Sequence, residues 1–218
     1  MKTLLILGTG GQAKAVWDAA NSQYDRVIFL SNETVGSSFC GCPAFFSADI
    51  DPVDLDVHFD EAIVAIGNNK LRWELTKRLT KQGYALATVI HPTAYVSPGA
   101  SVALGSCVLA NASVNASASI GPACVINTGA VVDRDCVLRN AVSVSPKAAL
   151  GGGVKVGSFA WICIGACVSH ELHIGAGSIV AAGAAVIADV PSDVLVAGVP
   201  AEIKKRLPPS DPYGSARA

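Results

Sequence analysis

Residues 114–150 read VNASASIGPACVINTGAVVDRDCVLRNAVSVSPKAAL, and a large aliphatic residue returns at every sixth position of this stretch. The register extends in both directions, and its sixteen members are Val96, Val102, Val108, Val114, Ile120, Ile126, Val132, Leu138, Val144, Leu150, Val156, Ile162, Val168, Ile174, Val180 and Val186. A strict period of six suits neither an α-helix nor a long strand, but it is the period of hexapeptide rungs in a parallel β-helix. The register therefore predicts an all-β solenoid over residues 91–190.

A second column of residues supports this prediction. Two positions before each aliphatic residue stands a small or slim one, with Leu172 as the single larger exception. The column contains Ala94, Ala100, Ser106, Ala112, Ala118, Cys124, Ala130, Cys136, Val142, Ala148, Val154, Ala160, Ala166, Ser178 and Ala184. One large and one small inward position per rung allow each coil to stack its side chains on those of the next coil. The repeat alone indicates an architecture and no chemistry.

Residues 1–90 have a different pattern, in which strands and helices alternate. Leu4–Leu7 is a short apolar run, the turn GTGGQA leads into a helix to about Ala20, and Arg26–Leu30 forms a second strand. Further on, EAIVAIGNN predicts a buried strand, KLRWELTKRLTKQG a helix stopped by Gly83, and ALATVI another strand. We expect a small parallel α/β domain.

The turn GTGGQA fits G-x-G-x-x-A, a pattern in which backbone amides approach a phosphate at the start of a helix. A plain tight turn explains the same residues. The second strand ends in Ser31 and Asn32, where an acidic residue would usually hold the ribose of a dinucleotide, so a dinucleotide cofactor is disfavoured.

Composition excludes several classes of partner. The net charge is −1 and the pI is near 6.4, so no basic field is available for nucleic acid or an anionic membrane. No window reaches the roughly 18 consecutive apolar residues of a membrane span, and MKTLLILGTGG is a buried first strand in place of a signal peptide. The seven cysteines include no C-x-x-C pair, which favours reduced thiols in a cytoplasmic protein.

The order of motifs resembles one protein family. ILGTGGQAKAV, AIGNNKLR, VIHPTAYVSPGA, the hexapeptide array and VAGVPAEIKKRL occur in this order over residues 1 to about 207. They are similar to nucleotide-sugar acetyltransferases, which include the bacillosamine-pathway N-acetyltransferase and the sialic-acid O-acetyltransferase-like proteins. The resemblance implies a Rossmann-like domain that binds a UDP-sugar at 1–90, and a left-handed parallel β-helix at 91–190 that forms a homotrimer and binds acetyl-CoA between subunits. Residues 191–218 would then be an extension with a short helix, opened by the proline of GVPAEIKKRL, and a loose tail.

The resemblance also implies site residues. Positions that surround the nucleotide and sugar are Gly8, Gly10, Gly11, Gln12, Ser31, Asn32, Ile66, Gly67, Asn68 and Asn127. Gly152 matches the glycine whose N–H faces the thioester carbonyl, and Ile164 and Ala182 match contacts to pantetheine. The resemblance further implies a role in surface polysaccharide biosynthesis.

The match fails at the family's most informative position. Relatives read V-x-H-x-C where this chain has Arg134, and that histidine with the acid after it is taken as the general base. A second family histidine is Ser143 here, the family glycine after SP is Lys147, and the histidine of the first glycine turn is Gln12.

Arg134 cannot replace a general base, because the pKa of a guanidinium lies above about 12. An amine acceptor that is partly uncharged can attack the thioester directly, and Asp133 or Asp135 can take the proton after attack. Two alternatives remain open: the Asp-Arg-Asp cluster forms only surface or intersubunit ion pairs, or Arg134 binds a substrate carboxylate or phosphate.

Other charged residues offer fewer roles. His170 lies 36 residues after Arg134, two coils along the axis and roughly 10 Å away, so it either lines the cofactor cleft or is solvated. Lys204 and Lys205 either meet CoA phosphates or cover a solvated helix face. His91, His170 and His173 have no spacing that gathers three zinc ligands, so no metal is expected.

The leading hypothesis is an acetyl-CoA-dependent N-acyltransferase acting on a nucleotide-linked amino sugar without a protein base. One alternative is a sugar O-acetyltransferase with an unrecognised base. The other is a non-catalytic protein that binds a nucleotide sugar or CoA.

Overall fold

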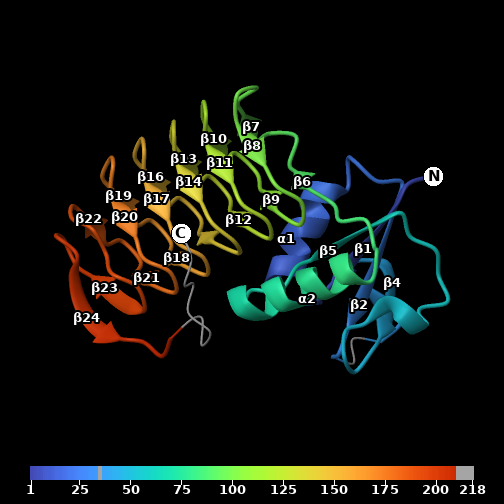
Figure 1. The fold of residues 1–218 in the computed structure, drawn as a ribbon. Coiled ribbons are helices and arrows are strands. Elements are labelled where there is room, and N and C mark those ends of the chain that lie inside the picture. The colour runs from blue at the N-terminus through green and yellow to red at the C-terminus, as the bar shows by residue number, and fades with distance from the viewer. Residues whose placement is uncertain (34–35, 210–218) are drawn as a thin grey trace.

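The structure is a computed structural model that describes residues 1–33 and 36–209. Figure 1 shows an α/β unit at the N-terminal end of a long solenoid of stacked coils. This arrangement confirms the predicted fold class.

The α/β unit is built on a five-stranded sheet of order β3-β4-β2-β1-β5. Its strands are β1 (Thr3–Leu7), β2 (Arg26–Ser31), β3 (Ser38–Phe39), β4 (Cys42–Phe46) and β5 (Glu61–Val64). β1, β2, β4 and β5 are parallel, and β3 pairs with β4 antiparallel. The helices are α1 (Gly11–Ala20), α2 (Asn69–Lys81) and the 3₁₀ turn Pro52–Asp54. Both predicted helices and the three predicted buried strands are confirmed, whereas the β3–β4 hairpin was not foreseen.

The strand predicted over ALATVI is divided between the two units. Leu86 forms only an isolated bridge to Ala62 of the α/β sheet, while β6 (Val89–Ile90) pairs with the solenoid strand at Cys107–Val108. The end of the ALATVI segment belongs to the solenoid because its backbone pairs with the next coil.

The solenoid has three faces of parallel two-residue strands, and face 3 ends in two longer strands, of which the last is antiparallel. Face 1 consists of β7 (Tyr95–Val96), β10 (Ser113–Val114), β13 (Val131–Val132), β16 (Ala149–Leu150), β19 (Cys167–Val168) and β22 (Ala185–Val186). Face 2 consists of β8 (Ser101–Val102), β11 (Ser119–Ile120), β14 (Val137–Leu138), β17 (Lys155–Val156) and β20 (His173–Ile174). Face 3 consists of β6, β9 (Cys107–Val108), β12 (Val125–Ile126), β15 (Ser143–Val144), β18 (Trp161–Ile162), β21 (Ile179–Val180), β23 (Val194–Ala197) and β24 (Glu202–Arg206).

Each of the sixteen register aliphatics is the second residue of one of these strands, and the small column lies beside it in the same core. Partners on one face are one coil apart, as in the pairing of Ser113 with Val131. We call the turns between faces 1 and 2 corner 1–2, those between faces 2 and 3 corner 2–3, and those between faces 3 and 1 corner 3–1.

The short C-terminal helix predicted from GVPAEIKKRL is wrong. Glu202–Arg206 is strand β24, and it pairs antiparallel with β23. The last parallel strand would otherwise leave its backbone groups unpaired, and this hairpin satisfies them. Lys204 and Lys205 therefore lie on a strand, and the predicted loose tail falls largely outside the described residues.

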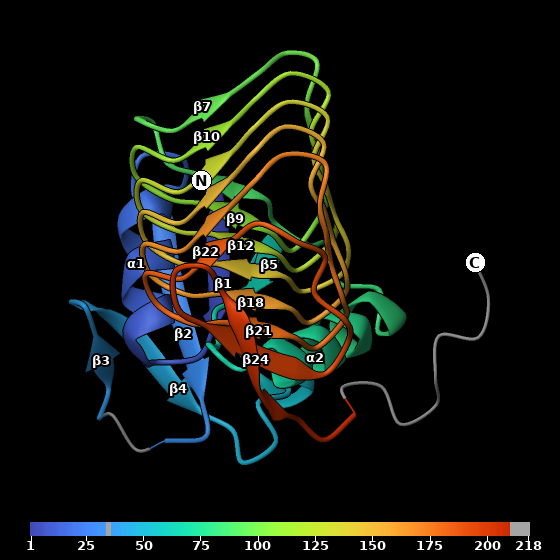
Figure 2. The ribbon, with the colours of Figure 1, turned by 90° about the vertical axis from the view of Figure 1, so that its left-hand side faces the viewer.

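The α/β unit rests on face 3, and Figure 2 shows it along one side of the stacked coils. Residues of α1 and β1 share one buried cluster with Cys107, Leu109 and Val125 of the solenoid. This continuous apolar contact places the carboxyl ends of the α/β strands close to the middle coils.

Candidate functional site

A cavity of about 340 Å³ lies at the carboxyl ends of β1, β2 and β5. It gathers eight of the predicted nucleotide residues: Gly8, Gly10, Gly11, Gln12, Ser31, Asn32, Ile66 and Gly67. Gly8 has φ +118°, and a Cβ there would lie 2.9 Å from the carbonyl oxygen of Ala65, so only glycine fits this crossing of the two loops. α1 begins at Gly11 and presents its unpaired N–H groups at this cavity, as an anion site requires.

The end of β2 differs from the expectation drawn from Ser31 and Asn32. Ser31 is buried, and its hydroxyl lies 2.8 Å from that of Thr9 and accepts the N–H of Glu33 at 3.0 Å. Glu33 itself lines the cavity. An acidic residue is therefore present directly after Asn32, and the sequence signal for it was an acid just after the predicted strand.

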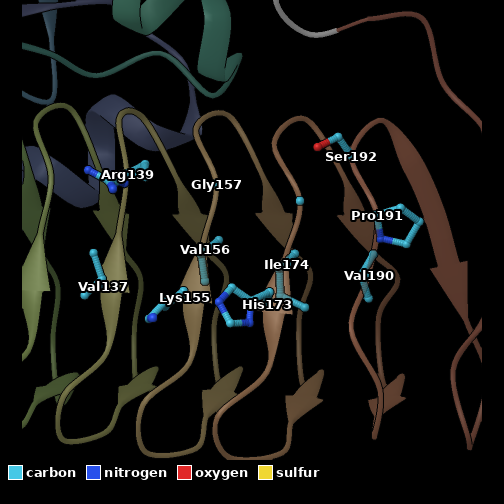
Figure 3. A pocket seen from close by; sticks show the side chains of 11 residues that line it. Val137, Arg139, Lys155, Val156, Gly157, His173, Ile174, Val190, Pro191 and Ser192 are labelled. Atoms are coloured by element: carbon cyan, nitrogen blue, oxygen red, sulfur yellow. The ribbon is translucent and has the colours of Figure 1, made fainter. Parts of the chain in front are cut away.

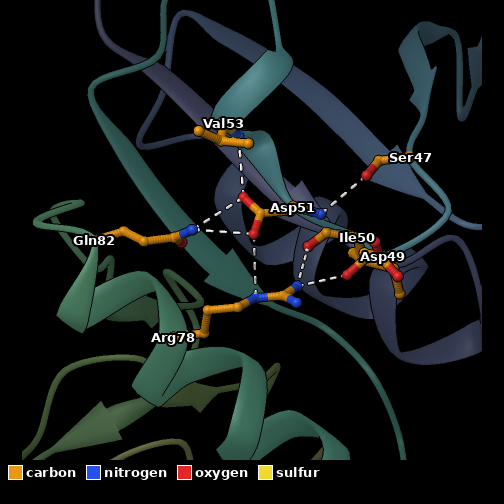
Figure 4. A network of polar contacts seen from close by, with 7 residues as sticks. All are labelled: Ser47, Asp49, Ile50, Asp51, Val53, Arg78 and Gln82. Carbon is orange, nitrogen blue, oxygen red and sulfur yellow. Dashed lines mark hydrogen bonds and ion pairs between the residues drawn. The ribbon is translucent and has the colours of Figure 1, made fainter.

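One wall of this cavity is held by the polar network in Figure 4. The Arg78 guanidinium on α2 donates to the carbonyl oxygens of Asp49 and Ile50. Its Nε lies 3.6 Å from the Asp51 carboxylate, an ion-pair distance beyond hydrogen-bond reach, and Gln82 donates to the same carboxylate. Ile50 lines the cavity, so the network fixes that wall.

Asn68 does not line this cavity. It is the N-cap of α2, and its side chain accepts the N–H of Leu71 at 3.0 Å. It borders a neighbouring cavity of about 350 Å³ against Trp161 and Ile179 of face 3.

Arg134 lies on corner 1–2, within a cluster of paired charges. The Asp133 carboxylate accepts the N–H of Arg134 at 2.8 Å and the Asn115 amide at 3.0 Å. Arg134 Nη1 lies 2.9 Å from Asp135 Oδ2, and both side chains are exposed. The Asn115 amide is the largest cause that lowers the pKa of Asp133, followed by the Arg134 N–H and, more weakly, the N–H of Gly152. Within one chain, Arg134 and Asp135 therefore form a surface ion pair, which is one of the alternatives that the sequence left open.

Gly152 lies directly beside Arg134 in the next coil. A Cβ at Gly152 would lie 3.1 Å from Arg134 Cζ, so the guanidinium covers this backbone. His170 follows one coil later, and the N–H of Glu171 donates to the carbonyl of Gly152 at 2.8 Å. Arg134, Gly152 and His170 thus form one column along corner 1–2, as their spacing predicted.

The predicted pantetheine contacts lie on a different edge. Ile164, which is 55% exposed, and Ala182 occupy successive turns of corner 3–1, where the N–H of Gly183 donates to the carbonyl of Ile164 at 2.9 Å. Asn127 lies on this corner too, and its side chain accepts the N–H of Thr128. Corner 3–1 and corner 1–2 are the two opposite edges of face 1.

Ser143 is apart from both columns. It is on β15 of face 3, where its hydroxyl donates to Asn69 Oδ1 of α2 at 2.7 Å. Lys204 pairs with Glu202 at 3.0 Å on β24, and Lys205 lies beside it, near the C-terminal end of the solenoid. The structure therefore does not bring Ser143 to Arg134 within one chain.

A further cavity of about 460 Å³ lies on face 2, away from all predicted site residues. Figure 3 shows Val137, Lys155 and His173 in line on successive strands, with Arg139 beside them. The ring of His173 lies 3.8 Å from Asp189. Among the described residues, no cluster of His, Cys, Asp and Glu suitable for a metal occurs, and no helix is long and apolar enough to span a membrane.

Comparisons with known proteins identify the family that shares this fold. Residues 3–79 match the PglD N-terminal domain family. A histidine-to-asparagine variant of perosamine N-acetyltransferase from Caulobacter crescentus, solved with CoA and GDP-perosamine, is 37% identical with a TM-score of 0.89, covering 94% of this chain and 98% of that one. The acetyltransferase domain of PglB from Neisseria gonorrhoeae, solved with acetyl coenzyme A, is 35% identical with a TM-score of 0.85, covering 93% and 98%.

A match to serine acetyltransferase 2 of Arabidopsis thaliana, 37% identical over 91 residues, spans 37% of this chain and only 28% of the plant protein. Fold and comparisons define a left-handed β-helix acyltransferase of the hexapeptide-repeat class. Within that class, the chain belongs to the family of nucleotide-sugar N-acetyltransferases with a PglD-type N-terminal domain.

Proposed function

We propose that this protein transfers the acetyl group of acetyl-CoA to the amine of a nucleotide-linked amino sugar. The α/β domain at 1–90 holds the nucleotide, the β-helix at 91–190 holds acetyl-CoA, and the described part of the C-terminal extension, residues 191–209, continues the solenoid. The observation that carries this proposal is the match over nearly the whole chain to an enzyme solved with CoA and a GDP-linked amino sugar.

UDP and GDP are the two candidates for the nucleotide of the substrate. The sequence resemblance favours UDP, whereas the Caulobacter relative is solved with GDP-perosamine. For either nucleotide, we expect the diphosphate at the start of α1 and a hydrogen bond from a ribose hydroxyl to Glu33, because these residues line the same cavity.

A homotrimer completes the site. The outward residues of face 1 are Tyr95, Ser113, Val131, Ala149, Cys167 and Ala185, all uncharged and most of them small. Packing face 1 around a threefold axis brings corner 1–2 of one copy against corner 3–1 of the next. Arg134, Gly152 and His170 then face the neighbour's pantetheine residues Ile164 and Ala182, with Lys204 and Lys205 near the phosphate end of CoA.

The chemistry requires no protein base. The uncharged amine attacks the thioester carbonyl, the carbonyl π electrons move to oxygen, and the N–H of Gly152 donates to that oxyanion. Collapse expels CoA as a thiolate, and the proton of the new ammonium passes to the thiolate directly or through Asp133 or Asp135. Holding the two reactants in place supplies as much rate as a base would, roughly 10² to 10⁴ or more.

The test is a thiol-release assay with acetyl-CoA and 4-amino sugars linked to GDP or UDP. Thiol release and N-acetylated product with one amine substrate, and none with the matched hydroxyl sugar, are the expected results. Release with the hydroxyl sugar alone supports the O-acetyltransferase alternative. Binding of nucleotide sugar and CoA without turnover supports the non-catalytic alternative.

A further inference from the structure

Arg72 is the most deeply buried charged residue of the described chain. Its side chain projects from α2 into the contact between the α/β unit and the solenoid, and the residue is 1% exposed. No ion pair to a carboxylate forms at Arg72 among the described residues. Desolvation lowers the pKa of Arg72, but a guanidinium in a protein stays charged. A buried cation without a counter-ion is costly, so its neighbours must satisfy every donor.

Oxygen atoms from both units satisfy this guanidinium. Toward the nucleotide cavity, Nη1 donates to the carbonyl of Ile66 at 2.9 Å and contacts that of Gly67 at 3.4 Å. Toward the solenoid, Nε donates to the carbonyl of Ala123 at 2.8 Å and Nη2 to that of Ala141 at 3.1 Å.

Two side chains complete the set. Nη2 lies 2.8 Å from Asn69 Oδ1 and 3.2 Å from Ser143 Oγ, and Ser143 donates to the same Asn69 oxygen. The Asn69 amide nitrogen in turn donates to the carbonyls of Phe159 and Ala160. One planar group on α2 is thereby joined to consecutive coils of the solenoid.

The two carbonyl acceptors in the solenoid come from stacked turns, which explains how one guanidinium reaches both. Ala123 and Ala141 occupy equivalent turns of corner 2–3 in successive coils, and both have positive φ, at 57° and 52°. The guanidinium spans these stacked turns on one side and the Ile66–Gly67 loop on the other. Because the fork is rigid, it sets the separation of the nucleotide loop and the coils.

We infer that Arg72 is a positioning residue that keeps the nucleotide-sugar cavity in register with the β-helix. This inference rests on the proposed function, in which the amine is carried by the α/β unit and the thioester by the solenoid. Attack requires the reacting atoms within about 3 to 3.5 Å, and a displacement of about 1 Å costs on the order of 100-fold in rate. Loss of the guanidinium leaves the two units joined by their apolar contact but free to shift.

The kinetic test compares Arg72→Met and Arg72→Lys with the full-length enzyme, well below each variant's melting temperature. Arg72→Met should lower kcat by about 10²-fold while the KM for acetyl-CoA stays within about 3-fold, since the solenoid alone holds that substrate. Arg72→Lys keeps the charge but loses the fork and should recover part of the rate. A folded Arg72→Met variant with kcat within about 3-fold of the wild type would overturn the inference.

A second readout does not depend on turnover. Binding of GDP or UDP to the wild type should slow hydrogen exchange both at residues 66–72 and at residues 141–144. In Arg72→Met, the protection should remain at the loop and be lost at the coil, and Arg72→Lys should restore part of the protection at the coil. Lys77→Met, an exposed change on the same helix, should behave as wild type in both assays. If nucleotide binding does not slow hydrogen exchange at residues 141–144 of the wild type, the nucleotide loop and the coil are not coupled. The inference then fails even where acetyl transfer is observed.

Discussion

Arg134 is the residue that the sequence resemblance matches to the relatives' presumed base, and its surroundings define what it can do. It is paired with Asp135 at 2.9 Å and lies across the backbone of Gly152. The neighbouring carboxylate raises the pKa of Arg134 further, so proton acceptance by this side chain is excluded. Its remaining roles are electrostatic: it forms the ion pair with Asp135, or it binds a carboxylate or phosphate of the substrate.

We predict that Arg134→Ala retains amine acetylation, within about 10-fold of the wild-type kcat/KM. The reason is that attack by an uncharged amine needs no side-chain base, so kcat/KM should rise with pH until the amine is fully deprotonated. The measurement is the pH profile of kcat/KM for both proteins. Arg134→His is the matched control, because it restores a titratable base and should make the profile level off at lower pH. A flat profile for Arg134→Ala, or a loss above about 10⁴-fold, contradicts the base-free mechanism.

Sequence reasoning identified some residues of the site and missed others for a physical reason. The glycines of the cavity and the anomaly at Arg134 are visible as local patterns. Glu33 was missed because it lies just beyond Ser31 and Asn32, where such an acid is usually found. Arg72 was missed because it is one of several cations on an amphipathic helix, and only the packing of a second unit on that helix buries it.

At the scale of the element, the coil turns obey a rule that the aliphatic register does not reveal. From Gly105 to Gly183, the positive-φ positions recur in steps of six and are taken by Gly, Asn, Ser, Ala, Asp, Lys, Phe and Glu. Many side chains therefore tolerate this turn. At some other positions of the rung, glycine is required for a different reason, because a Cβ there would clash with the backbone of the next coil.

This distinction predicts different costs for two glycine substitutions. Gly165→Ala, at a positive-φ turn with nothing within 4 Å, should lower the free energy of unfolding by about 1 kcal/mol. Gly175→Ala should lower it by about 3 kcal/mol or more, because its Cβ would lie 2.3 Å from the backbone nitrogen of Ser192 and force the last coil to move. Urea denaturation of both variants measures the difference. Equal destabilisation would show that backbone strain, and not coil stacking, determines the cost.

The C-terminal segment shows where prediction of an element fails. EIKKR carries no apolar period, so helix and strand are not distinguished by its sequence. The unpaired edge of β23 decides the outcome, and that edge exists only once the solenoid has formed. The β3–β4 hairpin was missed likewise, since its residues gain their strand form from the neighbouring β2.

At the scale of the whole molecule, the predicted catalytic and cofactor columns are separated by the width of face 1. The register predicts three faces but not which of them packs against another copy. The outward columns distinguish them: face 2 carries Lys155 and His173, face 3 is covered in part by the α/β unit, and face 1 is uncharged. We propose that assembly through face 1 unites both columns in one site.

Val131→Arg tests this assembly directly. Val131 is 36% exposed at the middle of face 1, between Ser113 and Ala149, so an arginine there would place three like charges around the proposed axis. We expect a folded monomer by circular dichroism and analytical ultracentrifugation, and no acetyl transfer, because no second copy supplies corner 3–1. Ser119→Arg is the matched control at the corresponding outward position of face 2, and it should remain trimeric and active. A trimeric Val131→Arg protein would exclude face 1 as the interface, and an active monomer would show that one chain completes the site by itself.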